Sequence, residues 1–169
     1  MIASTFAKGF KGEIQNRAFA IRAIGRLANR LDGDPRQPLW AAYLKLEEFN
    51  VPIYRQAAAR WGLDVTPKAG TLIKAWMLGS VPKCLLGPFL KLVYSKTVVY
   101  CEELRRLRNI GPSDSRDFLD YMVDQEDLQI EMMRLSLDGQ DAALARKIDS
   151  FFNKYDGKFM LERAWTQAK

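Results

Sequence analysis

The stretch QPLWAAYLKLEEFNVPIYRQAAARW, residues 37–61, decides the fold. Its apolar and aromatic residues recur at spacings of three and four, which is the period of an α-helix with one buried side. One such stripe contains Trp40, Tyr43, Glu47, Asn50, Tyr54, Ala57 and Trp61. The same period continues over most of the chain, without the alternating pattern of β-strands. We therefore predict an all-α protein, an up-and-down helical bundle.

Glycine and proline residues mark where the predicted helices begin and end. The predicted helices cover residues 4–31, 37–61, 67–79, 88–109, 113–138 and 140–155, with a short tail helix within 156–169. We assign the whole chain, 1–169, to a single domain. Within it we expect an extra N-terminal amphipathic helix in 1–36, a bundle core in 37–155 and the tail helix in 156–169.

The composition excludes several classes of function. The chain has 169 residues, a formal charge of +6 and no histidine. Without histidine it cannot build a Ser-His-Asp or Cys-His nucleophile, an imidazole base, or a histidine-ligated zinc, haem or di-iron centre. Any proton transfer would have to use Glu, Asp, Tyr, Lys or Cys side chains. The sequence leaves open whether the protein is an enzyme.

The sequence also gives an expectation for the compartment. Two separated thiols, Cys84 and Cys101, make neither a disulfide framework nor a zinc site. Residues 1–15 lack the apolar core of a signal peptide, so we expect a cytoplasmic protein. The most apolar region, 71–101, is interrupted by lysines, so we expect no transmembrane helix. These lysines are Lys74, Lys83, Lys91 and Lys96.

Charge is unevenly distributed along this basic chain. Residues 113–141 carry a formal charge of −7, whereas residues 1–36, 37–112 and 142–169 carry +4, +6 and +3. Ion pairs between neighbouring helices are the simplest explanation for such an alternation. The alternative is a basic surface for an anionic partner.

Polar residues interrupt the apolar sides of three predicted helices. They are Glu47 and Asn50 in 37–61, Glu103 in 88–109, and Glu126 and Gln129 in 113–138. Residues three apart project to one side of a helix, so these side chains can converge on the bundle axis. A buried carboxylate is costly unless it is paired, protonated or bound to metal. If Glu47, Glu103 and Glu126 meet, they therefore require a cation, a shared proton or an arginine.

The order of these residues resembles the ferritin-like superfamily. The similarity covers residues 40–138 and rests on the carboxylate in the aromatic stripe, on YCEEL at 100–104 and on QEDLQ at 125–129. Members of that superfamily hold a di-iron or di-manganese centre with glutamates and two Glu-x-x-His pairs. Here Asn50 and Gln129 stand where the histidines would be, and amides are poor ligands for iron. The resemblance therefore implies a bundle without redox chemistry or cofactor, and Glu47, Glu103 and Glu126 are weak metal candidates.

A purely structural role for the same carboxylates is an alternative. Glu47 could bond to Asn50, Glu103 could pair with Arg106 or Lys96, and Glu126 could pair with an arginine of the first helix. Such networks perturb the pKa values of their members without any catalysis.

Aromatic and methionine side chains on the inward sides predict an interior that can hold a ligand. We interpret the chain as a non-redox bundle that binds an apolar or aromatic small molecule. The predicted ligand-binding residues are Glu47, Asn50, Tyr54, Glu103, Glu126, Gln129, Tyr43 and Tyr100. The glycine- and proline-rich segment 79–88 would form the mouth of this site. The alternative function is a carboxylate-based enzyme that uses the same glutamates.

The first helix carries a basic stripe opposite its apolar side. The stripe consists of Lys8, Lys11, Arg22, Arg26 and Arg30. This pattern is typical of helices that dock on an anionic membrane or protein surface, and it also fits a helix packed on the bundle. We expect no nucleic-acid partner, because exposed aromatics are not interleaved with the basic groups and segment 113–141 repels phosphate. The sequence is compatible with a monomer or a homodimer.

Overall fold

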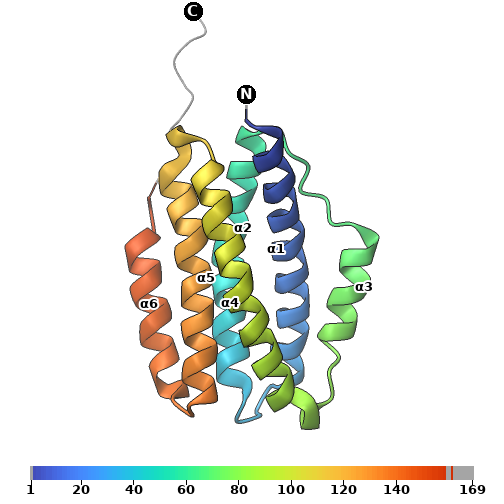
Figure 1. Ribbon diagram of the computed structural model, residues 1–169. Coiled ribbons are helices and arrows are strands. Elements are labelled where there is room, and N and C mark those ends of the chain that lie inside the picture. The colour runs from blue at the N-terminus through green and yellow to red at the C-terminus, as the bar shows by residue number, and fades with distance from the viewer. Residues whose placement is uncertain (1, 159–160, 162–169) are drawn as a thin grey trace, which may run out of the picture.

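The computed structural model describes residues 2–158 and 161, and this part of the chain is helical without strands (Figure 1). The helices are α1 (Ser4–Arg30), α2 (Gln37–Arg60), α3 (Ala69–Leu78), α4 (Leu86–Ile110), α5 (Arg116–Leu137) and α6 (Leu144–Tyr155). The prediction of an all-α bundle is confirmed. Most of the predicted tail helix lies outside the described residues.

The four long helices α1, α2, α4 and α5 lie side by side and form the bundle (Figure 1). At one edge α6 packs on α2 and α5, and at the opposite edge α3 packs on α1. The first helix is therefore part of the bundle core, which does not begin at residue 37 as predicted. The reason is that α1 buries Phe6, Phe10, Ile24 and Leu27 against α2 and α4.

The acidic segment is neutralised within the bundle. Side chains of 113–141 pair with basic residues on α2, α4 and α6. The pairs are Arg60–Asp114 at 2.8 Å, Arg105–Asp127 at 2.6 Å, Arg108–Asp120, Lys147–Glu131 at 2.7 Å and Lys154–Asp124 at 2.6 Å. This confirms ion pairing between neighbouring helices as the explanation for the alternating charge of these segments.

Gly79, directly after α3, lets this helix end close to α1. A Cβ atom at Gly79 would lie 2.8 Å from the Cβ of Arg26 and 2.9 Å from the backbone oxygen of Ala23. Arg30 also donates a hydrogen bond from Nη1 to the Gly79 carbonyl at 2.8 Å. Because a backbone atom is one of the neighbours, a side chain at 79 forces the two segments apart.

We expect Gly79→Ala to loosen α3 from α1 and to destabilise this contact by about 1–3 kcal/mol. The measurement is amide hydrogen exchange in α3, which should become faster. Gly70→Ala is the matched control, because a Cβ there has no neighbour within 4 Å, and we expect unchanged or slower exchange. Equal exchange in the wild type and Gly79→Ala would contradict this account of the contact.

Candidate functional site

A buried arginine on α1 joins carboxylates from three helices. Arg17 is 7% exposed, and its Nη1 donates to Oε1 of Glu47 at 2.8 Å and to Oε1 of Gln125 at 3.0 Å. Its Nη2 donates to Oε2 of Glu126 at 2.9 Å. Its Nε lies 3.0 Å from Oε1 of Glu13, an ion-pair contact without hydrogen-bond geometry. One guanidinium therefore faces three glutamates from α1, α2 and α5.

Tyrosines and amides complete this buried network. Both oxygens of Glu13 accept hydrogen bonds, one from the hydroxyl of Tyr54 at 2.9 Å and one from the hydroxyl of Tyr100. The other hydrogen bonds run from Tyr43 to Gln129 (2.6 Å), from Gln129 to Glu47 (3.0 Å) and Gln125 (2.8 Å), from Asn50 to Gln125 (3.1 Å), from Gln125 to Glu126 (3.0 Å) and from Tyr121 to Asn50. We call these eleven residues the Arg17 cluster: Glu13, Arg17, Tyr43, Glu47, Asn50, Tyr54, Tyr100, Tyr121, Gln125, Glu126 and Gln129.

The cluster holds more acidic groups than basic ones. Burial raises the pKa of Glu47 to about 7, although the charge of Arg17 opposes this rise. Burial likewise raises the pKa of Glu126 to about 7. Burial alone would lower the pKa of Arg17, but the three glutamates outweigh it and hold that pKa well above its ordinary value. Arg17 is therefore always charged, whereas Glu47 and Glu126 are only partly ionised at neutral pH.

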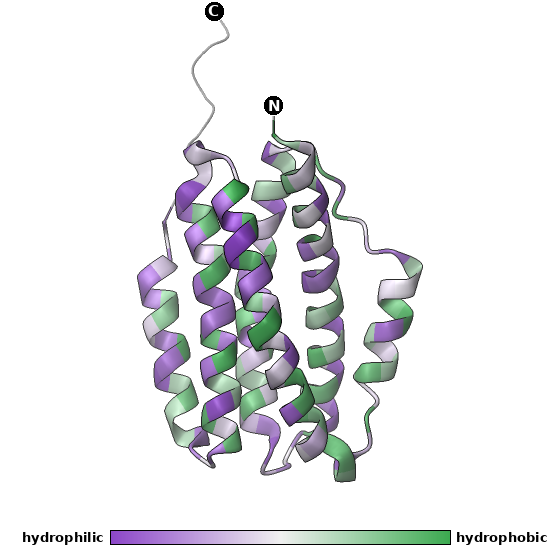
Figure 2. Ribbon diagram, viewed as in Figure 1, coloured by the Kyte–Doolittle hydropathy of each residue, from purple (hydrophilic) through white to green (hydrophobic). Residues whose placement is uncertain are grey.

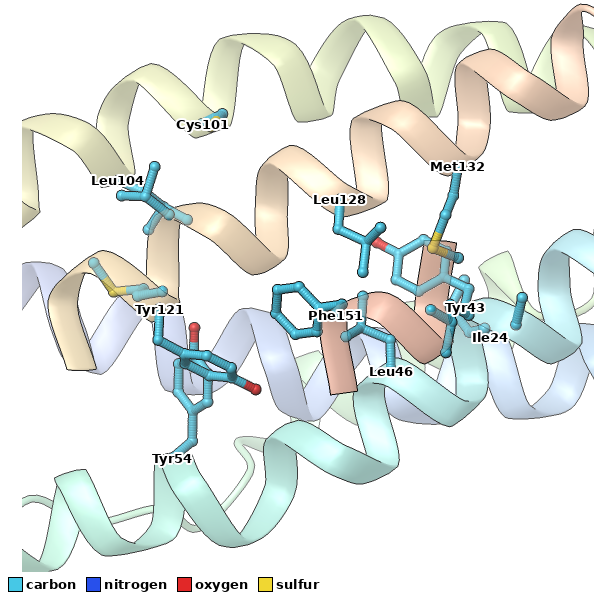
Figure 3. Close-up of a cluster of buried hydrophobic side chains, with 14 of the residues drawn as sticks. Ile24, Tyr43, Leu46, Tyr54, Cys101, Leu104, Tyr121, Leu128, Met132 and Phe151 are labelled. Atoms are coloured by element: carbon cyan, nitrogen blue, oxygen red, sulfur yellow. The ribbon is translucent and has the colours of Figure 1, made fainter. Parts of the chain in front are cut away.

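The tyrosines of the cluster act as neutral hydrogen-bond donors. Burial raises the pKa values of Tyr43, Tyr54, Tyr100 and Tyr121 above their ordinary value. Figure 3 shows three of them, Tyr43, Tyr54 and Tyr121, among apolar side chains such as Leu128. Their hydroxyls satisfy the buried acceptors, while their rings extend the core.

The thiol nearest to the cluster is not an activated nucleophile. Cys101 is buried on α4, and burial raises its pKa to about 12. Its Sγ donates a weak hydrogen bond to Oδ1 of Asp127 at 3.3 Å. A thiol becomes nucleophilic when its pKa is lowered, so this environment favours the inert form.

Two grooves reach the Arg17 cluster from different sides of α1. The first, of about 670 Å³, lies between α1, α2 and the segment after α2, and its lining includes Ile21 and Glu47. We call it the α1–α2 groove. The second, of about 580 Å³, is lined mainly by α1 and α4, with Leu78 at the end of α3 also in its lining, and we call it the α3–α4 groove. Its apolar lining includes Phe19, Trp40, Leu78, Phe89 and Val93, and its polar lining includes members of the Arg17 cluster such as Glu126.

Seven of the eight predicted ligand-binding residues belong to the cluster. They are Tyr43, Glu47, Asn50, Tyr54, Tyr100, Glu126 and Gln129. Glu103 does not join the cluster, because its side chain is exposed, although it lines the α3–α4 groove. α4 instead buries the stripe that includes Leu90, Thr97 and Leu104.

Four members of the cluster were not predicted: Glu13, Arg17, Tyr121 and Gln125. The sequence does contain a signal for Glu13 and Arg17, because both lie in the same stripe of helical spacing as Phe10 and Ile24. The full stripe is Phe6, Phe10, Glu13, Arg17, Ala20, Ile24, Leu27 and Leu31. The alternative in which Glu126 pairs with an arginine of the first helix is confirmed, and that arginine is Arg17.

The cluster does not have the donor set of a metal centre. Among residues 2–158 and 161, no group of three or more His, Cys, Asp or Glu side chains is arranged to hold a metal ion. Glu47 and Glu126 each direct an oxygen to Arg17, whereas Glu103 is exposed and makes no such contact. The guanidinium supplies the positive charge that the converging carboxylates require.

Comparisons with known proteins found no match among family models, curated proteins or solved structures. The Arg17 cluster and the two grooves beside it are therefore the features on which a functional proposal rests.

Proposed function

We propose that the protein binds an apolar or aromatic small molecule in the α3–α4 groove, with the Arg17 cluster orienting its polar end. The observation that carries this proposal is the combination of an apolar groove with buried hydrogen-bonding groups in its lining. Small-molecule sites typically combine apolar walls with a few convergent polar groups that fix orientation.

The walls of the groove favour a flat or elongated apolar ligand. Phe19, Trp40 and Phe89 contribute aromatic rings, and Leu78 and Val93 contribute aliphatic groups. The rings of Trp40 and Phe89 are stacked, with centroids 6.0 Å apart and an interplanar angle of 24°. Stacked rings present a flat apolar surface, against which an aromatic body packs well.

The polar part of the groove lining favours a neutral polar group on the ligand. Arg17, Tyr43, Tyr100 and Glu126, all members of the Arg17 cluster, line the groove. In the described part of the chain, no hydrogen bond reaches Oε1 of Glu126, so this oxygen is available to a hydroxyl, phenol or amide. An anionic group is disfavoured, because three glutamates already surround the single guanidinium.

Two finer features also remain proposals. The ferritin-like relationship is supported only by the order of the motifs at 40–138, and the cytoplasmic location only by the lysines and the N-terminal composition. Neither is needed for the binding of a ligand in the α3–α4 groove.

We expect the uncharged dye Nile red to bind the folded chain saturably, at one dye per chain, with a blue-shifted and stronger emission. Val93→Trp should abolish this binding, because the larger ring fills the α3–α4 groove. Ile21→Trp is the matched control, since Ile21 is also partly buried but lines the α1–α2 groove. A fluorescence titration of each folded variant, checked by circular dichroism, measures the effect.

Three outcomes would contradict the proposed site. They are equal dye binding in Val93→Trp and the wild type, loss of binding in Ile21→Trp alone, and binding that begins only after partial denaturation by urea. The double variant Ile73→Ser/Met77→Ser removes two exposed apolar side chains outside the groove. This variant should keep the saturable binding of the dye. That result would distinguish binding in the groove from binding to exposed apolar side chains.

A further inference from the structure

We propose that α3 and the first half of α4 form a surface that docks on a membrane containing anionic lipid. We call this surface the α3–α4 face and define it as the exposed side chains of residues 65–101. The juxtaposition of large exposed apolar side chains with unpaired lysines carries the proposal. It does not depend on the groove holding a ligand, although residues of α4 and Leu78 of α3 also line that groove.

The α3–α4 face exposes large apolar side chains. Ile73, Trp76 and Met77 on α3, and Leu92 and Val99 on α4, are each between 57% and 62% exposed. Figure 2 shows hydrophobic residues along α3 and along the half of α4 that begins near it. Single exposed apolar residues are ordinary, but several of this size on two helices that follow each other in the chain indicate an interaction surface.

The charge of this face has one sign. No aspartate or glutamate occurs in residues 65–101, which contain five lysines. Lys83 pairs with Asp34 at 3.2 Å. The remaining four make no ion pair with any described residue, and they are Lys68, Lys74, Lys91 and Lys96. The acidic segment 113–141 is therefore paired with other basic residues and does not neutralise this face.

An anionic lipid surface fits this combination better than a second copy of the chain. Two copies facing each other would bring unpaired lysines of the same sign together, which is unfavourable. At a lipid surface, apolar side chains enter the headgroup region while the long lysine stems extend to the phosphates. Trp76, beneath the guanidinium of Arg26 at 5.2 Å, is of the residue type enriched at membrane interfaces.

The face fits docking on the surface rather than crossing. The stretch Lys83–Ile110 is long and apolar enough to span a membrane, and only 22% of its most apolar window is buried. However, the second half of α4 is tied to α5 by ion pairs from Arg105 and Arg108. α4 can therefore present its first half to lipid while it remains part of the bundle.

This assignment moves the predicted membrane-docking surface away from the first helix. The apolar side of α1, which includes Phe6, Phe10 and Ile24, is buried in the core. α1 consequently offers a membrane only its basic stripe, whereas the α3–α4 face offers both lysines and apolar side chains. If the α3–α4 face docks, substitutions on that face should weaken membrane binding. If α1 docks, substitutions in its basic stripe should do so instead.

The test is co-sedimentation of the full chain with vesicles of equal parts phosphatidylcholine and phosphatidylglycerol. We expect binding that weakens at high salt and is much weaker with phosphatidylcholine alone. Lys74→Gln/Lys91→Gln should weaken partitioning about fivefold for each lysine. Ile73→Ser/Met77→Ser should weaken it at least about tenfold, because two apolar side chains no longer enter the interface.

Matched controls remove equal groups from other surfaces. Lys8→Gln/Lys11→Gln takes two exposed charges from the basic stripe of α1, and Ile110→Ser takes a half-exposed apolar side chain from the far end of α4. Both should bind as the wild type does, and circular dichroism should show all variants folded.

The proposal is overturned if the anionic vesicles sediment no protein, or if the control variants lose as much binding as the variants of the α3–α4 face. Binding to a polyanionic protein such as polyglutamate, equal to that seen with vesicles, would also overturn it.

Discussion

Replacing Arg17 by methionine is expected to lower the free energy of unfolding at about pH 8 by at least about 3–5 kcal/mol. Methionine keeps much of the volume but removes the positive charge that, among the described residues, alone pairs with Glu13, Glu47 and Glu126. These carboxylates would then be buried without compensation, which is far more costly than a lost surface ion pair. Urea denaturation followed by circular dichroism measures the change.

Two further variants keep this prediction testable if Arg17→Met does not fold. Arg22→Met is the matched control on the same helix, because Arg22 is exposed and donates a hydrogen bond to the backbone oxygen of Ala18 at 2.9 Å, outside the Arg17 cluster. We expect it to change stability by less than about 0.5 kcal/mol. Adding Glu47→Gln and Glu126→Gln to Arg17→Met removes two of the uncompensated carboxylates and should restore part of the stability. Wild-type stability in Arg17→Met alone would show that the guanidinium does not hold the cluster together.

The free energy of unfolding of the wild type is expected to fall by about 5 kcal/mol as the pH rises from about 5 to about 8. In the folded chain, burial raises the pKa values of Glu47 and Glu126 from 4.5 to about 7. The folded state therefore binds these protons more tightly than the unfolded state does. The resulting stabilisation is complete below the unfolded pKa and is lost as the pH rises through about 7.

This pH range is free of other titrating side chains of ordinary pKa, because the chain contains no histidine. Surface aspartates such as Asp34 and Asp114 have lowered pKa values, caused by hydrogen bonds from Arg36 and Arg60. The stabilisation of the folded state by these two aspartates is complete above the ordinary aspartate pKa. It is lost only when the pH falls below that value. Stability should therefore be greatest near about pH 5.

The variant Glu47→Gln/Glu126→Gln should flatten the dependence of stability on pH, since glutamine keeps the shape of the side chain but does not titrate. Glu48→Gln is the matched control, because Glu48 is the exposed neighbour of Glu47 on α2. It should keep the wild-type slope. The raised pKa values would be refuted by a wild-type stability that increases between about pH 5 and pH 8, or by an unchanged slope in the double variant.

The helices themselves were largely predictable from the sequence. Apolar spacing and glycine or proline punctuation placed the first helix at 4–31, and α1 covers Ser4–Arg30. The spacing shows which side of a helix is buried, but it does not show against which other helices that side packs. An amphipathic helix docked on a bundle and a helix inside the bundle both have one apolar side. The pattern therefore predicts an N-terminal helix outside the bundle core, whereas α1 lies in the core.

The site was predicted in part for a related physical reason. On α4, two stripes have helical spacing, one through Leu92, Val99 and Glu103 and the other through Leu90 and Leu104. Because apolar residues occur on both, the sequence could not decide which one is buried. The exposed stripe that contains Glu103 is also the one that contributes to the α3–α4 face.

The Arg17 cluster has a consequence for how the bundle assembles. Its contacts come from four helices, since Tyr100 of α4 reaches the same Glu13 that Arg17 contacts. Sliding any one of these helices by a single turn, about 5.4 Å, would set a charged or amide group against an apolar neighbour. Apolar side chains alone would tolerate such an offset at a smaller cost. The buried charges therefore select one mutual alignment of the four helices and penalise every shifted one.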